Sequence, residues 1–469
     1  MPLPDLIEIV PLEKPIHAEV TVPGSKSITN RALILAALAE GETVLQGALW
    51  SEDTQIMVEC LQEIGFMVNV EVDPSENCNR TITVYGKGGV VPAGGTEQQP
   101  LDLFVGNAGT AARFLSAFVC LGKGVYRLHG VPRMHERPQV ALFKALRELG
   151  YRVESENGNE KLPVKICSRR GDEAHSKNQS LLTSAATSRS CNVSIEESSQ
   201  FASALLLCAK TGNWEIKITG ENAEESPYVA MTMELIKAFP HQGGSFQIEP
   251  DASSGSYFWG AEFLLRTQKE MVEEDCDTGI YRFNTDFFPI ITSQQPSFSI
   301  IVQSWPTSFM QIDSQFPRYL PLPAEISRVR HLGDSIMTAI VLGTFSDRFI
   351  RFTDLARLRA QECERVVALR VELTKCGAKV IEEANTLTVY PSNLHGAEIE
   401  TYNDHRMAMC FAILGLKVPG IKIKNSACVK KTFPNFFQKL AAAPPHGLGA
   451  KILDGKTGRT LTHEELFAD

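Results

Sequence analysis

Apolar residues along this chain gather in short, dense runs, and six of these runs directly follow a polar segment rich in Gly, Ser, Asp or Asn. The polar segments are residues 24–27, 106–110, 197–200, 251–254, 333–335 and 403–406. The runs that follow them read ALILAALA, FLSAFVCL, ASALLLCA, YFWGAEFLL, MTAIVLG and MAMCFAIL. Because a helix that is apolar on all sides belongs in a core, the pattern predicts six buried helices that each start at a polar turn.

A second kind of segment follows several of these runs, with apolar residues at i, i+3, i+4 and i+7. Examples are IMVECLQEIGFMVNVEV, VALFKALRELGYRVES and VVALRVELTKCGAKVIEE. Each predicts an amphipathic helix followed by a strand, so the repeated unit is strand, buried helix, strand, amphipathic helix, strand. Six irregular copies in 469 residues favour an α/β protein with two closed domains of about three units each.

Composition narrows the class of protein. The chain is 43% hydrophobic and 22% charged, which is typical of a soluble globular protein. Its net charge of −9 argues against sequence-independent nucleic-acid binding, which requires a broad cationic surface. No apolar run is long enough to span a bilayer, and the N-terminus lacks the features of a signal peptide. The 11 cysteines show neither a C-x-x-C pair nor zinc-ligand spacing. We therefore expect a cytoplasmic protein with no membrane or nucleic-acid partner.

Cationic residues accompany the predicted helix starts. A helix N-terminus exposes unpaired backbone N–H groups and the positive end of its dipole, which together favour bound anions. Any one of these cations on its own suits a surface ion pair, but their repetition favours a multiply negative ligand if the fold brings them together. The candidates are Lys26, Arg31, Arg113, Arg137, Arg365, Arg406 and Lys431.

Two carboxylates stand beside these cations. Asp334 opens a predicted buried helix and on its own suits a helix cap, and Glu362 suits an ordinary ion pair. In a cation-lined cleft the two could divide the roles of base and acid. H-E-x-x-H, G-x-S-x-G and G-x-G-x-x-G motifs are absent, and the P-loop-like end at residues 454–457 has Ala450 where the motif requires Gly. Zinc-hydrolase, nucleotide-driven and redox chemistry therefore have no support.

The longer motifs resemble one family. PGSKSITNRALILAALAEGET, LFVGNAGTAARF, PRMHERP, SSQFASALL, DASSGSYF, NDHRMAM and KKTFPNFF are similar to the 5-enolpyruvylshikimate-3-phosphate synthase family, over residues 20–440. The resemblance implies a two-lobed inverse α/β barrel fold, each lobe with three βαβαββ units. It places residues 1–24 and 250–443 in the first lobe and 25–249 in the second. Residues 444–469 are expected to be a C-terminal tail.

The family resemblance also implies a reaction and its residues. The enolpyruvyl group of phosphoenolpyruvate passes to the 5-hydroxyl of shikimate 3-phosphate through a tetrahedral intermediate, with release of phosphate and without a metal or organic cofactor. Asp334 would be the base, Glu362 the proton donor and Lys26 their electrostatic partner or a proton carrier. The phosphoenolpyruvate site would comprise Lys26, Asn107, Gly109, Arg137, Gln200, Arg365, Arg406 and Lys431. The shikimate 3-phosphate site would comprise Lys26, Ser27, Arg31, Ser198, Ser199, Gln200, Ser226, Tyr228, Asp334 and Gln361. We expect a monomer.

One departure from the family pattern affects the charge of the site. Gln361 stands where a lysine usually precedes the catalytic glutamate, so a positive charge is missing there. Arg357 and Arg359 are the candidates to compensate. A non-catalytic anion-binding relative of the same fold is one alternative that this departure favours. A UDP-N-acetylglucosamine enolpyruvyl transferase is another, although its lysine-asparagine opening and loop cysteine do not occur in this chain.

Two further departures concern the shape of the site. Glu225 stands where a serine is usual, and we expect Ser226 to take its place through a local shift. Phe114 replaces a usual proline, and we expect it to reshape the helix that carries Gly109 and to alter tolerance of the inhibitor glyphosate. The glycine itself predicts a pocket that accommodates this inhibitor.

Overall fold

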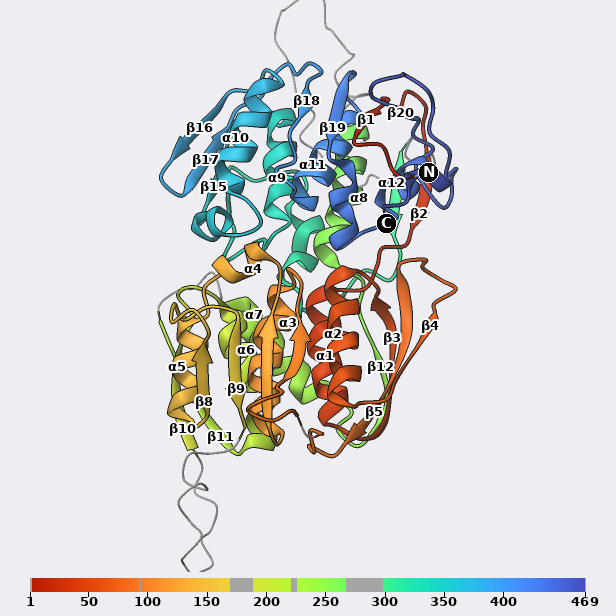
Figure 1. Ribbon diagram of the computed structural model, residues 1–469. Coiled ribbons are helices and arrows are strands. Elements are labelled where there is room, and N and C mark those ends of the chain that lie inside the picture. The colour runs from red at the N-terminus through yellow and green to blue at the C-terminus, as the bar shows by residue number, and fades with distance from the viewer. Residues whose placement is uncertain (1, 93, 169–188, 221–225, 267–297, 469) are drawn as a thin grey trace, which may run out of the picture. The chain divides into compact units, whose positions relative to one another are not determined.

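The computed structural model describes residues 2–92, 94–168, 189–220, 226–266 and 298–468, and the chain divides into two compact units (Figure 1). Unit 1 comprises Met1–Val22, Ala252–Thr307 and Ile312–Asp469. Unit 2 comprises Pro23–Asp251 and Ser308–Gln311. The predicted main boundaries, after residues 24 and 249, lie within two residues of the observed ones, whereas the short segment 308–311 was not predicted.

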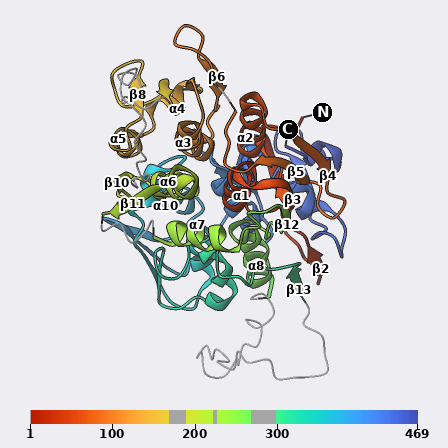
Figure 2. The ribbon, with the colours of Figure 1, turned by 90° about the horizontal axis from the view of Figure 1, so that it is seen from below.

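Unit 2 is built around three buried helices that pack against one another, as Figure 2 shows. These helices are α1 (Lys26–Leu38), α3 (Gly109–Phe118) and α6 (Ser199–Gly212). Its other helices are α2 (Glu52–Ile64), α4 (Pro132–Glu136), α5 (Val140–Glu148) and α7 (Ser226–Ala238). Its strands are β3 (Glu40–Leu49), β4 (Val68–Val72), β5 (Asn79–Lys87), β6 (Leu101–Phe104), β7 (Val125–His129), β8 (Arg152–Ser155), β9 (Val164–Cys167), β10 (Arg189–Ser194), β11 (Trp214–Thr219) and β12 (Gly244–Gln247).

Unit 1 also has three buried helices in mutual contact. They are α8 (Ala252–Arg266), α9 (Ile336–Leu342) and α11 (His405–Gly415). The other α-helices described in this unit are α10 (Arg365–Lys375) and α12 (Phe436–Ala441). The described strands are β1 (Leu6–Ile9), β2 (His17–Val20), β13 (Ser299–Val302), β14 (Glu325–Ser327), β15 (Ile350–Thr353), β16 (Val380–Glu383), β17 (Thr386–Val389), β18 (Glu398–Ile399), β19 (Ile421–Lys424) and β20 (Ile452–Asp454).

The sheets of the two units share one pairing pattern. Among the described residues, each unit has two four-stranded sheets and one parallel strand pair. The four-stranded sheets are β12-β3-β5-β4, β6-β7-β9-β8, β14-β15-β17-β16 and β18-β19-β1-β20. In each of them the first pair of strands is parallel and the next two pairs are antiparallel. The βαβαββ unit is continuous in sequence from β6 to β9 and from β14 to β17.

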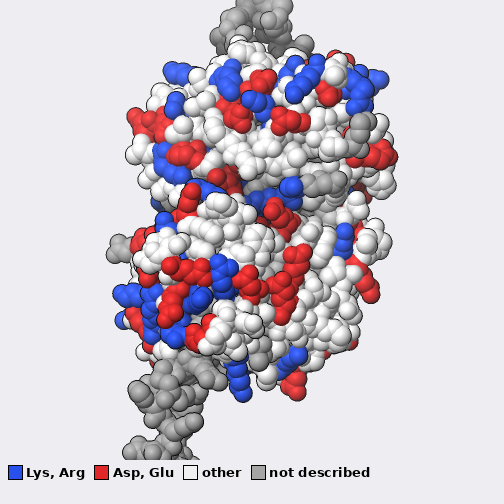
Figure 3. Space-filling model, in the orientation of Figure 1, with Lys and Arg blue, Asp and Glu red and all other residues white. Residues whose placement is uncertain are grey.

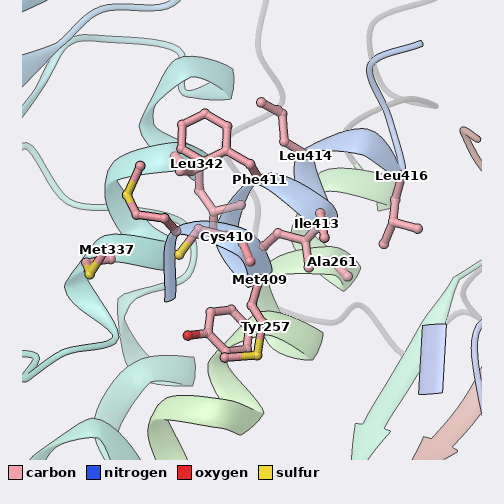
Figure 4. Packing of buried hydrophobic residues seen from close by; sticks show 14 of the residues in the cluster. Tyr257, Ala261, Met337, Leu342, Met409, Cys410, Phe411, Ile413, Leu414 and Leu416 are labelled. Carbon is pink, nitrogen blue, oxygen red and sulfur yellow. The ribbon is translucent and has the colours of Figure 1, made fainter. Parts of the chain in front are cut away.

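The six predicted buried helices are confirmed, as are the three predicted amphipathic helices, α2, α5 and α10. Every residue of α3 and of α9 is buried, as expected for helices with apolar side chains on every face. Figure 4 shows part of the core of unit 1, to which α8 contributes Tyr257 and Ala261, α9 contributes Met337 and α11 contributes Met409. The core thus fixes the three helices whose N-terminal ends carry the polar segments.

The C-terminal segment corrects the sequence analysis. Residues 444–469, expected to be a tail, belong to unit 1. Strand β20 pairs antiparallel with β1, and the side chains of Leu448, Ile452 and Leu466 are buried in the unit 1 core. The prediction is wrong because β20 is only three residues long and its partner lies near the other end of the chain, so the segment shows no local periodicity.

Candidate active site

The start of α1 carries Lys26, whose ammonium is fixed by a buried carboxylate. Nζ of Lys26 lies 3.0 Å from Oδ2 of Asp53 in the first turn of α2, and the Lys26 side chain remains 20% exposed. The turn before α1 requires glycine at position 24, because a Cβ there would lie 2.0 Å from the carbonyl oxygen of Gly47. The local chain path therefore sets the position of Lys26.

Arg31, one turn further along α1, is 2% exposed and is surrounded by oxygens without formal charge. Its Nε donates to Oγ1 of Thr232 at 2.7 Å, Nη1 to the carbonyl of Ser27 at 2.8 Å and Nη2 to Oγ of Ser203 at 3.2 Å. Burial lowers the pKa of Arg31 to about 10, and the neighbouring Tyr228 partly opposes this shift. The predicted substrate residues Ser27, Arg31 and Tyr228 thus come from α1 and α7.

The start of α3 places a guanidinium against a glycine. Nη1 of Arg137 donates to the carbonyl of Asn107 at 3.2 Å. A Cβ built on Gly109 would lie 2.5 Å from this Nη1 and 2.7 Å from Cζ of the same arginine. Gly109 therefore gives the Arg137 side chain the space to lie on the first turn of α3, where backbone N–H groups attract anions. Oδ1 of Asn107 is buried and has no hydrogen-bond partner among the described residues.

The start of α6 meets α3 through Gln200. Its Oε1 accepts a hydrogen bond from Arg113, and its Nε2 donates to Oγ1 of Thr110 at 3.2 Å. Oγ of Ser198 caps α6 by accepting from the backbone N–H of Gln200 at 3.3 Å. Ser198 and Ser199 are both buried. The structure thus joins three of the predicted site residues and the candidate cation Arg113 at one pair of helix starts.

In unit 1, three guanidinium groups surround Asp334. Its Oδ1 lies 3.0 Å from Nη2 of Arg328, and its Oδ2 lies 3.2 Å from Nη2 of Arg406 and 3.8 Å from Nη1 of Arg365. Burial on its own raises the pKa of Asp334, but the guanidinium groups of Arg406, Arg328 and Arg365 outweigh it and hold the pKa far below its usual range. The helix cap is Ser335, so Asp334 is not the N-cap of α9.

Gln361 contacts both Asp334 and Arg365, and Arg365 forms a buried ion pair. Its Oε1 accepts from Nη1 of Arg365, and its Nε2 lies 3.4 Å from Oδ1 of Asp334. Arg365 also binds Asp404 in a two-point contact, with Nε to Oδ2 at 2.7 Å and Nη2 to Oδ1 at 3.2 Å. Burial disfavours the charged form of Arg365, but Asp404 and Asp334 raise its pKa above the ordinary value. Asp404 also caps α11 through the backbone N–H of Arg406.

Glu362 has its own cation. Oε2 of Glu362 lies 2.6 Å from Nζ of Lys431, at the end of the short helix η7 (Ser426–Lys431), and the two side chains are 22% and 15% exposed. The two predicted catalytic carboxylates of unit 1 therefore lie in different surroundings, one among guanidinium groups and one against an ammonium.

On the face shown in Figure 3, Lys and Arg side chains lie among Asp and Glu side chains. The character of the site therefore depends on these local contacts.

A family model described as "EPSP synthase (3-phosphoshikimate 1-carboxyvinyltransferase)" matches residues 10–440. The chain belongs to the EPSP synthase family. A 3-phosphoshikimate 1-carboxyvinyltransferase of Trichormus variabilis is 32% identical over 459 residues, covering 93% of this chain and 98% of the relative. One from Opitutus terrae is 35% identical over 464 residues, covering 94% and 98%.

Solved structures carry the same fold. An EPSP synthase of Acinetobacter baumannii superposes with a TM-score of 0.63 at 20% identity, over 95% of this chain and 99% of that one. The enolpyruvyl transferase NikO of Streptomyces tendae superposes with a TM-score of 0.60 at 15% identity, over 98% of this chain and 100% of that one. The predicted enolpyruvyl transferase fold is thus confirmed.

The structure clarifies the departures from the EPSP synthase family pattern. Phe114 lies within α3, which runs from Gly109 to Phe118, and its ring centroid lies 5.3 Å from the Arg31 guanidinium carbon. The predicted reshaping of this helix relative to the family stays a prediction. Ser226 is the first residue of α7 and is exposed, whereas Glu225 lies outside the described residues. Arg359, a candidate to compensate for Gln361, forms salt bridges with Glu364 and Glu382.

Three residues that contact the predicted site are missing from the sequence analysis. Asp53 lies in the first turn of α2, and Asp404 is the N-cap of α11 inside one of the six polar segments. A search for acidic residues at helix starts could have found both. Arg328 lies at the end of a segment with weak patterning and offers no such signal. Binding and catalytic roles for the residues of both units stay predictions.

Within the residues that the structure describes, no group of three or more His, Cys, Asp or Glu side chains is arranged to hold a metal ion. The same part of the chain has no helix with the length and apolar character required to cross a membrane.

Proposed function

We propose that this chain transfers the enolpyruvyl group of phosphoenolpyruvate to the 5-hydroxyl of shikimate 3-phosphate and releases phosphate, a step of the shikimate pathway. The observation that carries the proposal is the family match over residues 10–440, which includes both carboxylates and every cation of the site. The relatives at 32–35% identity are 3-phosphoshikimate 1-carboxyvinyltransferases over nearly their whole length. The chain is therefore assigned as an enzyme of this activity.

Asp334 is proposed as the base that accepts the proton of the attacking 5-hydroxyl. In the structure its carboxylate is held ionised but is weakly basic, because guanidinium groups lower its pKa. Arg365 and Arg406 are also the residues that we assign to the anionic groups of phosphoenolpyruvate. When these anions bind the two arginines, they compensate positive charge beside Asp334, and its basicity rises. Substrate binding would thus activate the base.

The addition step needs a proton at the methylene carbon of phosphoenolpyruvate. As the hydroxyl oxygen forms its bond to C2, Glu362 delivers this proton and the methylene becomes a methyl group. Nζ of Lys431 donates to Oε2 of Glu362 at 2.6 Å, so the ammonium is placed to supply the proton that Glu362 passes on. In the elimination step the methyl group returns a proton to Glu362. The bond between C2 and the phosphate oxygen then breaks, and phosphate leaves.

Unit 2 is proposed to supply further contacts to the anionic groups of the substrates. Lys26, Arg137 and the first turn of α3 suit a phosphate, because they offer an ammonium, a guanidinium and backbone N–H groups. Asn107 and Gln200 would add neutral contacts to phosphoenolpyruvate. Shikimate 3-phosphate is assigned to Ser27, Arg31, Ser198, Ser199, Ser226 and Tyr228 of this unit and to Asp334 and Gln361 of unit 1.

We also propose that the chain works as a monomer in the cytoplasm, with no nucleic-acid or membrane partner. The ten cysteines in the part of the chain that the structure describes are all free thiols, which suits a reducing compartment. Light scattering on the purified protein at micromolar concentration should give the mass of one chain. A dimer mass would overturn the monomer assignment alone.

A phosphate-release assay tests the function. Release should require phosphoenolpyruvate and shikimate 3-phosphate together, with no release from either one alone. Release that depends instead on UDP-N-acetylglucosamine would support the other enolpyruvyl transferase. No release with either acceptor, while shikimate 3-phosphate still binds in calorimetry, would support a non-catalytic anion-binding relative.

A further inference from the structure

Two side chains donate to the same oxygen of Asp334. Nη2 of Arg328 lies 3.0 Å from Oδ1, and Nε2 of Gln361 lies 3.4 Å from this atom. One donor is a cation and the other is a neutral amide. The position at which the family resemblance expects a lysine thus reaches Asp334 with an uncharged group, while the charge arrives from another part of the chain.

We propose that Arg328 is a positioning residue for the reaction, supplying from the end of β14 the positive charge beside Asp334 that is missing at position 361. This inference rests on the proposed function, because it assigns Arg328 a role through the proposed base. The arrangement moves a charge from the segment before Glu362 to the turn after β14. Both positions reach the same carboxylate oxygen, Oδ1 of Asp334.

The amide at position 361 fits its neighbours better than an ammonium would. Oε1 of Gln361 accepts from the guanidinium of Arg365, and an ammonium has no acceptor to offer and would repel that cation. With Arg328 already on Oδ1, a neutral residue at 361 can accept from Arg365 and donate to Asp334 at once. Arg328 and Gln361 therefore form a coupled pair.

The backbone that carries Arg328 is firmly held. Its N–H donates to the carbonyl of Thr353 in β15 at 3.1 Å, next to the β14–β15 pairing. The Arg328 side chain is 1% exposed. Of the three guanidinium groups around Asp334, those of Arg365 and Arg406 are assigned to phosphoenolpyruvate. Arg328 has no such assignment, so it can keep the carboxylate oriented while the other two engage the substrate.

The other candidate cations serve as controls. Arg359 contacts Glu364 at 2.5 Å and Glu382 at 2.8 Å, both acidic groups outside the proposed catalytic set. Arg359→Gln removes a cation of the same unit without removing a contact to Asp334. Arg357→Gln tests the remaining candidate in the same way.

The experiment measures kcat and both KM values for Arg328→Gln, Arg328→Lys, Gln361→Lys and the double variant Arg328→Gln/Gln361→Lys. Loss of the donor that keeps Asp334 oriented should lower kcat of Arg328→Gln about tenfold to hundredfold, with KM for phosphoenolpyruvate changing less than about threefold. Lysine at position 361 should restore at least about tenfold of that loss in the double variant. Arg328→Lys should retain more activity than Arg328→Gln, and the two control variants should match the wild type.

The outcomes separate the two proposals. If the wild type releases phosphate and Arg328→Gln is equally fast, this inference is wrong and the proposed function stands. If Arg328→Gln is slow but lysine at 361 restores nothing, Arg328 acts through packing and the inference is also wrong. If Arg328→Gln does not fold, Arg328→Lys decides, because a kcat below one hundredth of the wild type would show that charge alone is not the requirement. A wild type without phosphate release would reject the proposed function itself.

Discussion

The charged groups of the two units differ in what they contact. In unit 1, Asp334, Asp404 and Glu362 each lie against at least one cation. In unit 2, the guanidinium of Arg31 is bound by hydroxyl and carbonyl oxygens and that of Arg137 by a carbonyl oxygen, although Lys26 does pair with Asp53. Neutral oxygens leave the net charge of a guanidinium uncompensated, whereas a carboxylate cancels it. Unit 2 therefore offers cations with little carboxylate compensation, whereas in unit 1 three carboxylates compensate most of the charge of four cations.

This difference suggests a division of labour. An anion that binds unit 2 adds a partner to cations surrounded by neutral groups. An anion that binds Arg365 or Arg406 in unit 1 must compete with a carboxylate already in place. The free energy of replacing a carboxylate by the anion depends on the strength of the existing ion pair. Substitutions of acidic residues in unit 1 should therefore change activity and stability more than substitutions of neutral groups in unit 2.

The largest effect is expected for Asp334→Asn. This change removes the proposed base, so kcat should fall about 10³-fold, within the range typical of general-base groups. Shikimate 3-phosphate should still bind within a few-fold of the wild-type affinity by calorimetry. Asp347→Asn, which removes a surface carboxylate bound to Arg348, is the control and should leave kcat unchanged. Unchanged turnover in Asp334→Asn would reject its role as base.

Asp404→Asn should cause the largest loss of stability. Asp404 is 0% exposed and Arg365 is 2% exposed, so removing the carboxylate leaves a buried guanidinium with less compensation. Breaking a buried pair of this kind costs about 3–5 kcal/mol of unfolding free energy, measurable by urea denaturation. Asparagine still caps α11, so comparison with Asp404→Ala separates the cap from the ion pair. A loss below about 1 kcal/mol in Asp404→Asn would contradict the importance of the pair.

Acid should weaken unit 1 through Asp334. Its pKa is lowered in the folded protein, so its carboxylate contributes stability above the unfolded-state pKa and loses that contribution as pH falls toward the folded value. Between about pH 5 and pH 3, the urea midpoint of the wild type should therefore fall more than that of Asp334→Asn. Parallel curves for the two proteins would mean that the carboxylate is not held ionised by its guanidinium partners.

Gly109→Ala should act on binding in unit 2. The added Cβ would lie 2.5 Å from Nη1 of Arg137, so the flexible guanidinium must move away from the start of α3. We expect KM for phosphoenolpyruvate to rise about tenfold with a smaller change in kcat, as for the loss of a positioned binding group. The control is the double variant Gly109→Ala/Arg137→Ala, in which the contact partner is already absent. Gly158→Ala would not be a matched control, because Gly158 has a positive φ. Additive effects in that pair would contradict the proposed contact.

The smallest effect is expected for Thr232→Val in unit 2. Valine keeps the shape of threonine but removes the hydroxyl that accepts from Nε of Arg31 at 2.7 Å. A buried donor without its partner costs about 1–3 kcal/mol of unfolding free energy. This loss should be smaller than that in Asp404→Asn under the same urea conditions. Equal losses would remove the difference between the two units.

The sequence alone predicts the helices of this fold well because their signals are local. The runs in α3 and α11 are apolar on all sides, and the period of α5 separates a buried face from an exposed one. The pairing of β20 with β1 carries no such signal, because each strand has only three or four residues and the partners are distant in sequence. Short strands depend on tertiary contacts for their assignment.

The candidate site shows the same contrast between residues that local sequence identifies and contacts that depend on distant parts of the chain. Motif resemblance can assign Asp334 and Glu362 as a pair of carboxylates, because each lies in an ordered run of residues. It cannot assign the partner of either one, since partners come from distant elements: Lys431 for Glu362, and Arg328 for Asp334. The residues that contact each carboxylate decide its protonation state, and these contacts are known only from the three-dimensional structure.

The placement of β1 between β19 and β20 has a consequence for synthesis on the ribosome. Except for Ser308–Gln311, unit 2 is one continuous stretch, so its sheets can form while later residues are still being made. Strand β1 is translated before all of unit 2, yet both of its neighbours follow it by several hundred residues. Its buried Ile7 and Ile9 must stay without their strand partners throughout that interval. Unit 1 thus matures after translation of β20, and the nascent chain carries an open sheet edge until then.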